Sequence, residues 1–205
     1  MKKFILIWWP PTTGKSTLAQ HLAKALDLPW FSTDQIRSLL KVYAEREETW
    51  WLFLPKWYDT AETFLERFSV EEIVDMEFAQ AFDVYPWVKV MLDDSYSYVN
   101  WCIIEWVNIT PEIIHTYLQE RDDILPIIVI DENLERIRET VYSRWLFDAA
   151  DTYDDTYKEK EVEWVELFLE RTKKDCEKYG ISCVSIEKNE SDTEKILSLV
   201  NSHFN

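Results

Sequence analysis

A short apolar run followed closely by the tetrapeptide Gly-Lys-Ser-Thr is the feature that most constrains this fold. Residues 4–8 are apolar without interruption, as in a parallel strand that is buried on both faces. The tetrapeptide occupies residues 14–17, and leucines at 18, 22 and 26 then predict an amphipathic helix from about Lys15. The order of strand, short loop and helix places the tetrapeptide at a helix N-terminus.

The residue types in this loop fit the binding of phosphate groups. Backbone N–H groups of such a loop and of the following helix N-terminus point into one concavity that holds an anion. Lys15 would reach the β- and γ-phosphates of a nucleotide, and the Ser16 hydroxyl would bind Mg²⁺. Gly14 lets the main chain approach the phosphates because it has no Cβ. The residues expected to bind the nucleotide are Pro11, Thr12, Thr13, Gly14, Lys15, Ser16 and Thr17. The alternative is a chance helix start, with Ser and Thr as caps and Lys15 solvated.

The rest of the chain alternates short apolar runs with longer amphipathic stretches, which is typical of a parallel sheet with crossover helices. We therefore expect one α/β domain over residues 1–205, with three layers and a parallel sheet of about five strands. Strands are predicted at 4–8, 29–32, 101–105, 124–130 and 181–186, and helices at 34–40, 132–144, 159–179 and 192–200, with a further helix from Pro111 and a mostly helical region over about 45–100. Gly180 is the predicted stop of the long helix.

Four blocks resemble P-loop small-molecule kinases of the adenylate-kinase-like group. The branch that holds 2-phosphoglycerate kinases and zeta-toxin-like kinases has a Gly-x-Pro-x-x-Gly-Lys-Ser-Thr loop, matched here by residues 9–17 except that Trp9 replaces the first glycine. Residues 32–37, Ser-Thr-Asp-Gln-Ile-Arg, match the branch's Ser-Thr-Asp-x-Ile-Arg segment. Residues 103–107 resemble a strand ending in Ile-Glu-Gly-Val, with Trp106 in place of glycine. Residues 142–155 resemble a lid segment.

This resemblance implies a P-loop NTPase fold with a helical acceptor region (45–100) and a lid (about 144–157). It implies an ATP- and Mg²⁺-dependent kinase that phosphorylates a small molecule, either 2-phosphoglycerate-like or another hydroxyl or phosphate acceptor. The implied catalytic residues are Lys15, Asp34 and Arg144; the implied acceptor-binding residues are Asp34, Arg37 and Glu105; the implied metal ligands are Ser16 and Glu105. A nucleotide or nucleoside kinase is one alternative. A catalytically impaired nucleotide-binding module is another, if Trp9 is genuine.

Each implied role has a structural alternative. Asp34 would orient or deprotonate the acceptor hydroxyl, but Asp is also a common helix N-cap. Arg37 would hold an anionic group of the acceptor, or be a plain surface residue. Glu105 follows an apolar run, where an unpaired carboxylate is costly to bury, so it either faces a metal ion and the acceptor or is a satisfied structural carboxylate. Arg144 would stabilise charge on the transferring phosphoryl group, with Arg136 and Arg138 as weaker candidates.

The glycine and tryptophan counts are unusual. Average usage predicts about 14 glycines in a chain of this length, yet there are 2 glycines and 11 tryptophans. Trp9 and Trp106 both stand where the resemblance expects glycine. Since some genetic codes read UGA as glycine and others as tryptophan, we predict that most of these tryptophans are glycines in the cell. Trp8, Trp50, Trp51 and Trp145 are further candidates because they stand at possible turns, whereas Trp164 is the best candidate for a genuine tryptophan.

The net charge indicates which classes of partner are disfavoured, and the cysteines indicate the cellular compartment. With 39 acidic and 22 basic residues, the net charge of −17 disfavours nucleic acid and anionic membranes as partners. The three cysteines form no CxxC motif, so free thiols and a cytoplasmic location are expected. The three histidines show no ligand spacing. The expected partner is a small molecule that accepts the phosphoryl group.

Overall fold

The computed structural model describes residues 2–8, 10, 14–40, 42, 61–93, 101–106, 109–143 and 153–204. Five parallel strands form one sheet in the order β2-β3-β1-β4-β5. Their bounds are β1 Lys3–Trp8, β2 Trp30–Ser32, β3 Trp101–Trp106, β4 Ile124–Ile130 and β5 Cys183–Ser185. The predicted α/β class and the five-stranded parallel sheet are therefore confirmed.

Helices connect the strands, as parallel pairing requires. Their bounds are α1 Lys15–Leu26, α2 Thr33–Leu40, α3 Ala61–Arg67, α4 Val70–Asp93, α5 Pro111–Ile113, α6 Leu134–Ser143, α7 Asp155–Tyr179 and α8 Glu190–Phe204, and α5 continues as a π-helical turn over Ile114–Leu118. Among these, α3 and α4 account for the described part of the region predicted to be mostly helical.

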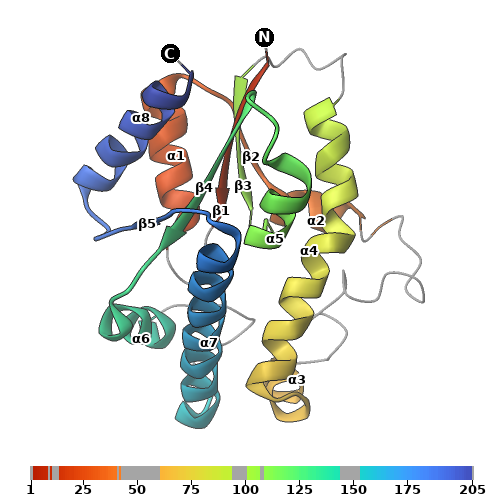
Figure 1. The fold of residues 1–205 in the computed structure, drawn as a ribbon. Helices are drawn as coiled ribbons and strands as arrows, with labels where there is room; N and C mark the ends of the chain where they lie inside the picture. Colours follow the sequence, from red (N-terminus) through yellow and green to blue (C-terminus); the bar gives the residue numbers. More distant parts are fainter. Residues whose placement is uncertain are drawn as a thin grey trace.

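The sheet is the middle of three layers (Figure 1). Side chains of a strand alternate between its two faces, so Phe4, Leu6 and Trp8 join the core under α3, α4, α5 and α7. Ile5 and Ile7 join the opposite core under α1 and α8. Burial on both faces explains why the run at residues 4–8 contains no polar residue.

Two local expectations are corrected by the structure. Trp8 is the last residue of β1 rather than part of a turn, is fully buried, and stacks on Phe168 with ring centroids 5.7 Å apart. The long helix α7 begins at Asp155, several residues before the predicted start. Asp154 causes this early start, because its carboxylate accepts a hydrogen bond from the backbone N–H of Thr156.

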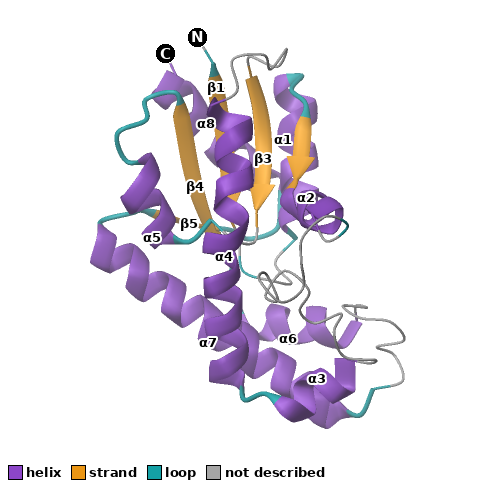
Figure 2. Ribbon diagram, turned by 90° about the vertical axis from the view of Figure 1, so that its right-hand side faces the viewer, coloured by secondary structure: helices purple, strands orange, loops and turns teal. Residues whose placement is uncertain are grey.

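The carboxyl ends of the strands point toward α6, α3 and the N-terminal part of α7 (Figure 2). Ser16 on α1, Asp34 on α2 and Glu105 in β3 lie at this edge, and ligands of open parallel sheets bind beyond the carboxyl ends of the strands. Within the described residues, no helix has the length and apolar character needed to cross a membrane.

Candidate functional site

Gly14 forms the turn from which α1 begins. Its φ of +88° and ψ of 20° lie in the left-handed region, which glycine adopts without the steric cost that a Cβ would bring. Its carbonyl accepts hydrogen bonds from the backbone N–H groups of Thr17 (3.1 Å) and Leu18 (3.2 Å). Helix α1 therefore begins at this turn, and its N-terminus lies at the carboxyl edge of the sheet, as the loop motif predicts.

The remaining loop assignments stay predictions. Pro11, Thr12 and Thr13 lie outside the described residues, and for Lys15 the structure describes only the backbone, as the first residue of α1. Arg144 and residues 145–152 of the predicted lid also lie outside the described parts of the chain.

Ser16 and Glu105, 89 positions apart in the sequence, meet at this edge. Glu105 is the penultimate residue of β3 and is 1% exposed. It is in register with Ile7 of β1 and Ser32 of β2. The Ser16 hydroxyl, in the first turn of α1, donates a hydrogen bond to Oε1 of Glu105 at 3.2 Å. The two residues that the resemblance implies as metal ligands are thus in direct contact.

These two groups have the chemistry that Mg²⁺ requires. Mg²⁺ prefers oxygen ligands, and proteins usually supply one or two of them while phosphate oxygens and water complete the octahedron. A hydroxyl and a carboxylate side by side, at the N-terminus of α1, fit this pattern. Ser16 and Glu105 would be the protein groups that hold the ion.

The predicted acceptor residues lie on α2, directly after β2. Asp34 and Arg37 form an ion pair at 3.5 Å, and Arg37 also donates a hydrogen bond from Nη1 to Oε1 of Gln80 at 2.7 Å. Asp34 lies within the first helical turn, since α2 begins at Thr33, so it does not occupy the N-cap position. Arg37 is only 21% exposed at its side chain and is not a plain surface residue.

Gln80, the hydrogen-bond partner of Arg37, was missed by sequence reasoning. It is 3% exposed and lies on α4, in the middle of the stretch that matched no recognisable motif. A buried polar residue within the apolar pattern of α4 was the available signal, but the partner on α2 could not be identified from spacing alone.

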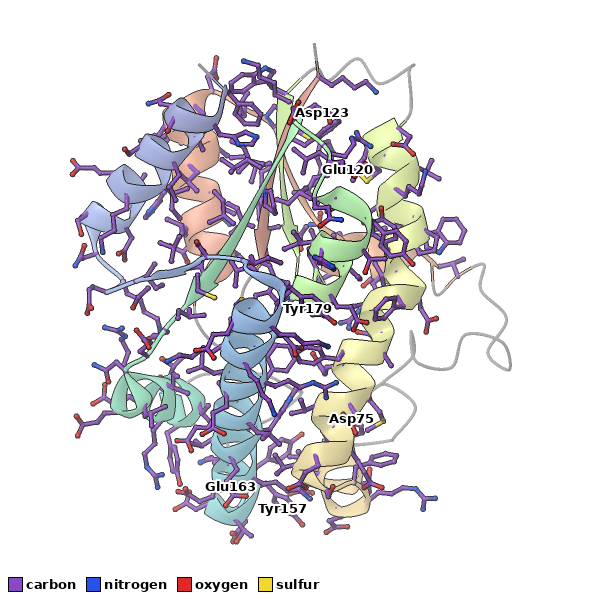
Figure 3. The ribbon with its side chains drawn as sticks, in the orientation of Figure 1. Asp75, Glu120, Asp123, Tyr157, Glu163 and Tyr179 are labelled. Carbon is purple, nitrogen blue, oxygen red and sulfur yellow. The ribbon has the colours of Figure 1, made fainter. Side chains whose placement is uncertain are left out.

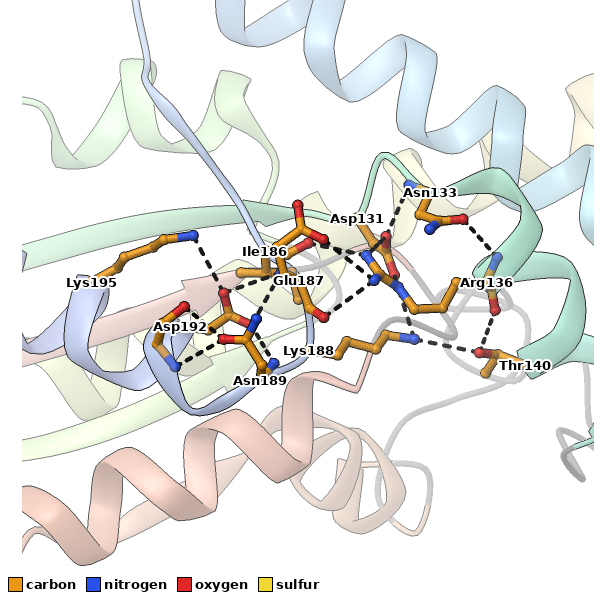
Figure 4. A network of polar contacts seen from close by, with 11 residues as sticks. Asp131, Asn133, Arg136, Thr140, Ile186, Glu187, Lys188, Asn189, Asp192 and Lys195 are labelled. Carbon is orange, nitrogen blue, oxygen red and sulfur yellow. Dashed lines mark hydrogen bonds and ion pairs between the residues drawn. The ribbon is translucent and has the colours of Figure 1, made fainter.

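A second cluster missed by sequence reasoning surrounds Asp131, the residue after β4 (Figure 4). Asp131 is fully buried and accepts hydrogen bonds from Arg136 at 2.6 and 3.0 Å and from the backbone N–H of Asn133 at 3.0 Å. Nζ of Lys188 lies 3.4 Å from the same carboxylate. Burial alone would raise the pKa of Asp131, but these donors and charges bring the pKa below its usual value.

The same network fixes the loop between β5 and α8. Arg136 donates to the backbone carbonyls of Ile186 and Glu187. Asp192 accepts hydrogen bonds from the backbone N–H groups of Glu187 and Asn189. Arg136 is therefore committed to this network, and the other weaker lid candidate, Arg138, pairs with Glu159 on α7.

A cavity of about 770 Å³ lies between this loop and α1, beside Gly14. Its volume is in the range of small-molecule binding sites in proteins. The lining comes from three segments: Gly14, Thr17, Leu18, His21, Lys24 and Ala25 on the α1 side, Ile186, Lys188 and Asn189 in the loop, and Asp192, Thr193 and Glu194 at the start of α8. His21, which had no assigned role, is one of these lining residues.

Known structures share the fold of this chain, although the sequence matches no family model and no curated protein. A shikimate kinase from Acinetobacter baumannii, solved with shikimate, is 14% identical with a TM-score of 0.51 over 100% of this chain and 96% of that chain. A shikimate kinase from Bacteroides thetaiotaomicron is 12% identical with a TM-score of 0.51 over 97% and 98%. An uncharacterized protein from Eubacterium ventriosum is 13% identical with a TM-score of 0.54 over 98% and 99%. At such identities the likeness concerns the fold: the chain has the three-layer α/β fold of P-loop kinases.

Proposed function

We propose that this protein is a Mg²⁺- and ATP-dependent kinase that transfers the γ-phosphoryl group to a small molecule. The observation that carries the proposal is the contact between Ser16 and Glu105 at 3.2 Å, beside the left-handed turn at Gly14. A phosphate loop, a metal-binding hydroxyl and a buried carboxylate on the adjacent strand are the groups that phosphoryl transfer needs for positioning and for neutralising charge.

The nucleotide would occupy the cavity beside α1. Gly14 belongs to the proposed phosphate loop and also lines the cavity. The base and ribose of a nucleotide bound between α1 and the loop at 186–189 would therefore direct its phosphates toward the N-terminus of α1. The hydrogen bonds from Arg136 to this loop would hold the base-side wall in place before the nucleotide binds. Such preorganisation lowers the entropic cost of binding.

The acceptor would lie on the β2 side of Glu105, near α2. Asp34 would orient the acceptor hydroxyl and accept its proton, and Arg37 would contact an anionic group of the acceptor. An acceptor that carries a phosphate or carboxylate, such as 2-phosphoglycerate, suits Arg37, and Gln80 holds that guanidinium in position. Bound Mg²⁺ would supply charge neutralisation at the phosphate oxygens.

Nucleotide binding can be tested without knowing the acceptor. Calorimetric titration with a non-hydrolysable ATP analogue, with and without Mg²⁺, should show binding that Mg²⁺ strengthens. Both Ser16→Ala and Glu105→Gln should abolish that strengthening, because each removes a metal ligand. The titrations should use the chain as printed and a Trp9→Gly/Trp106→Gly variant. Turnover is then measured with 2-phosphoglycerate and a panel of hydroxy acids, nucleosides and nucleoside monophosphates.

Matched variants separate this effect from general damage. Ser202→Ala changes an exposed serine near the end of α8, and Glu161→Gln changes a buried glutamate on α7. Both controls should keep the Mg²⁺ dependence. The proposal fails if neither form of the chain binds the analogue, or if Ser16→Ala and Glu105→Gln bind it with unchanged Mg²⁺ dependence. Binding without turnover on any acceptor would favour the impaired nucleotide-binding module.

A further inference from the structure

Two cysteines lie in contact away from the candidate site. Cys176 is in the last turn of α7 and is 3% exposed, while Cys183 is the first residue of β5 and is half-buried. Their sulfur atoms are 2.8 Å apart. A disulfide bond is about 2.05 Å long, so little movement separates this contact from a covalent bond.

The chain holds both cysteines by their backbones. Gly180, at φ +68°, ends α7, and the backbone N–H of Ile181 then donates to the carbonyl of Cys176 at 2.9 Å. β5 pairs with β4, with Cys183 in register with Ile128. Figure 3 labels Tyr179 at the end of α7 that meets the sheet, far from Tyr157 at the other end of the helix. A helix terminus and a sheet strand thus hold the two thiols together from opposite sides.

We propose that Cys176 and Cys183 are a redox-active pair that closes reversibly into a disulfide by exchange with a small-molecule disulfide such as oxidised glutathione. The thiolate of Cys183 attacks one glutathione sulfur, the glutathione S–S bond breaks, and one glutathione thiolate leaves. The thiolate of Cys176 then attacks the Cys183 sulfur and releases the second glutathione. Two cysteine thiols are oxidised, one external disulfide is reduced, and the two cysteine protons pass to the two glutathione thiolates.

The order of attack follows from accessibility and charge. Cys183 is the more exposed sulfur, and the Cys176 thiol beside it, together with the charge of Lys173, lowers the pKa of Cys183. The pKa of Cys176 is raised by the contact of this thiol with Cys183 and by burial. The remaining cysteine, Cys102, is buried in β3, and burial raises its pKa to about 11. The structure therefore predicts which pair oxidises and which cysteine stays reduced.

Peptide mapping tests the pair directly. The intact folded chain is equilibrated in glutathione buffers of increasing oxidation, blocked with iodoacetamide and digested with trypsin. Cleavage after Lys174, Lys178 and Lys188 separates the two cysteines into peptides 175–178 and 179–188. We expect these peptides to appear cross-linked, to separate on reduction, and Cys102 to be alkylated throughout.

The disulfide between Cys176 and Cys183 should form more readily in the folded chain than in the unfolded chain, where only their closeness in sequence favours it. The equilibrium constant for exchange with glutathione should be at least about tenfold larger in the folded chain than in the chain unfolded in guanidinium, which by linkage raises Tm by roughly 4 °C. Cys176→Ser should accumulate a glutathione adduct on Cys183, whereas Cys102→Ser should behave as the unaltered chain. Equal constants in the folded and unfolded chains, or a cross-link that includes Cys102, would overturn the proposal.

Discussion

Two acidic residues at the carboxyl edge of the sheet differ in the groups that contact them. Asp131, after β4, is matched by Arg136 and Lys188, so a divalent cation there would have to displace a positively charged side chain. Glu105, on the other side of β1, accepts a hydrogen bond from a neutral hydroxyl. The charge of Asp131 is thus matched within the fold, which gives this residue a structural role. The role of Glu105 as a metal ligand is the proposal that the Mg²⁺ titrations test.

The structural role of Asp131 predicts a large effect on stability. Asp131→Asn should lower the free energy of unfolding by about 3 kcal/mol, because it leaves Arg136 and Lys188 without their buried counter-charge. Asp75→Asn, which breaks an exposed pair with Arg171, should cost less than about 0.5 kcal/mol. Urea unfolding of the three proteins measures both values, and equal losses in the two variants would contradict the assignment.

The same carboxylate predicts a pH dependence. The pKa of Asp131 is lower in the folded protein than its usual value, so its contribution to stability is complete above about pH 5 and is lost as the pH falls below about 4. The gap between the unaltered chain and Asp131→Asn should therefore close on acidification. Unfolding curves of both proteins from neutral to acidic pH give the measurement, and a gap that stays constant would exclude this origin.

Asp34 provides the residue-scale test of catalysis. If it orients the acceptor and accepts its proton, Asp34→Asn should lower turnover by about 10²- to 10⁴-fold and leave the affinity for the ATP analogue nearly unchanged. Turnover with the acceptor found in the panel, and calorimetry with the analogue, are the two readouts. A variant that loses nucleotide affinity as strongly as turnover would place Asp34 in the nucleotide site instead.

At the scale of elements, apolar runs in the sequence predicted the strands well, whereas the ends of elements that lie in polar sequence were predicted less well. β4 was predicted at its observed bounds, Ile124–Ile130, because its run ends at Asp131 and leaves no ambiguity. β5 is shorter than predicted, at Cys183–Ser185. The start of α7 was missed because the cap at Asp154 lies within a run of acidic residues that has no hydrophobic period.

The end of α7, by contrast, depends on one residue that the sequence identifies. Gly180 has φ +68°, and a Cβ there would meet no atom within 4 Å, so substitution should cost only backbone strain. Gly180→Ala should therefore destabilise the fold by about 1 kcal/mol, and Gly180→Asn by less, since Asn tolerates this conformation. Thermal unfolding of the three proteins gives the ranking, and Ala at least as stable as Asn would contradict it.

At the scale of the whole molecule, sequence alone predicted the sheet and named Ser16 and Glu105 as candidate metal ligands, but it did not predict their contact or the residues that support them. The loop motif and the strand-end glutamate are local signals, and a parallel sheet brings them to one edge. The Arg37–Gln80 contact joins residues 43 positions apart, and Arg136 reaches backbone carbonyls about 50 positions away. The spacing of residues in the sequence does not predict such contacts, because they depend on how the crossover helices pack against the sheet.

The last prediction concerns the identity of the tryptophans. The only two glycines in the chain both occupy left-handed positions, at φ +88° and +68°, and glycine is absent from the rest of the sequence. Trp106 directly follows Glu105 in β3, and Trp9 follows β1 in the sequence, at the position where the phosphate loop needs a residue without a side chain. We expect UGA codons, read as glycine in the cell, at positions 9 and 106 and at most of the other tryptophan positions.

Trp164, which is 5% exposed in the core, is the expected exception. The stacking of Trp8 on Phe168 shows that position 8 also accommodates an indole.

Sequencing the gene reads the codons, and mass spectrometry of the native protein reads the residues. The Trp9→Gly/Trp106→Gly variant should bind the ATP analogue with Mg²⁺ at least about tenfold more tightly than the printed chain, a difference of about 1.4 kcal/mol, because the phosphate loop is freed of an indole. A matched Trp87→Gly variant, which removes a half-exposed indole from α4, should leave this affinity unchanged. UGG codons at positions 9 and 106, or tryptophan at those positions in the native protein, would refute the recoding, and the weak phosphate loop would then be a property of the protein itself.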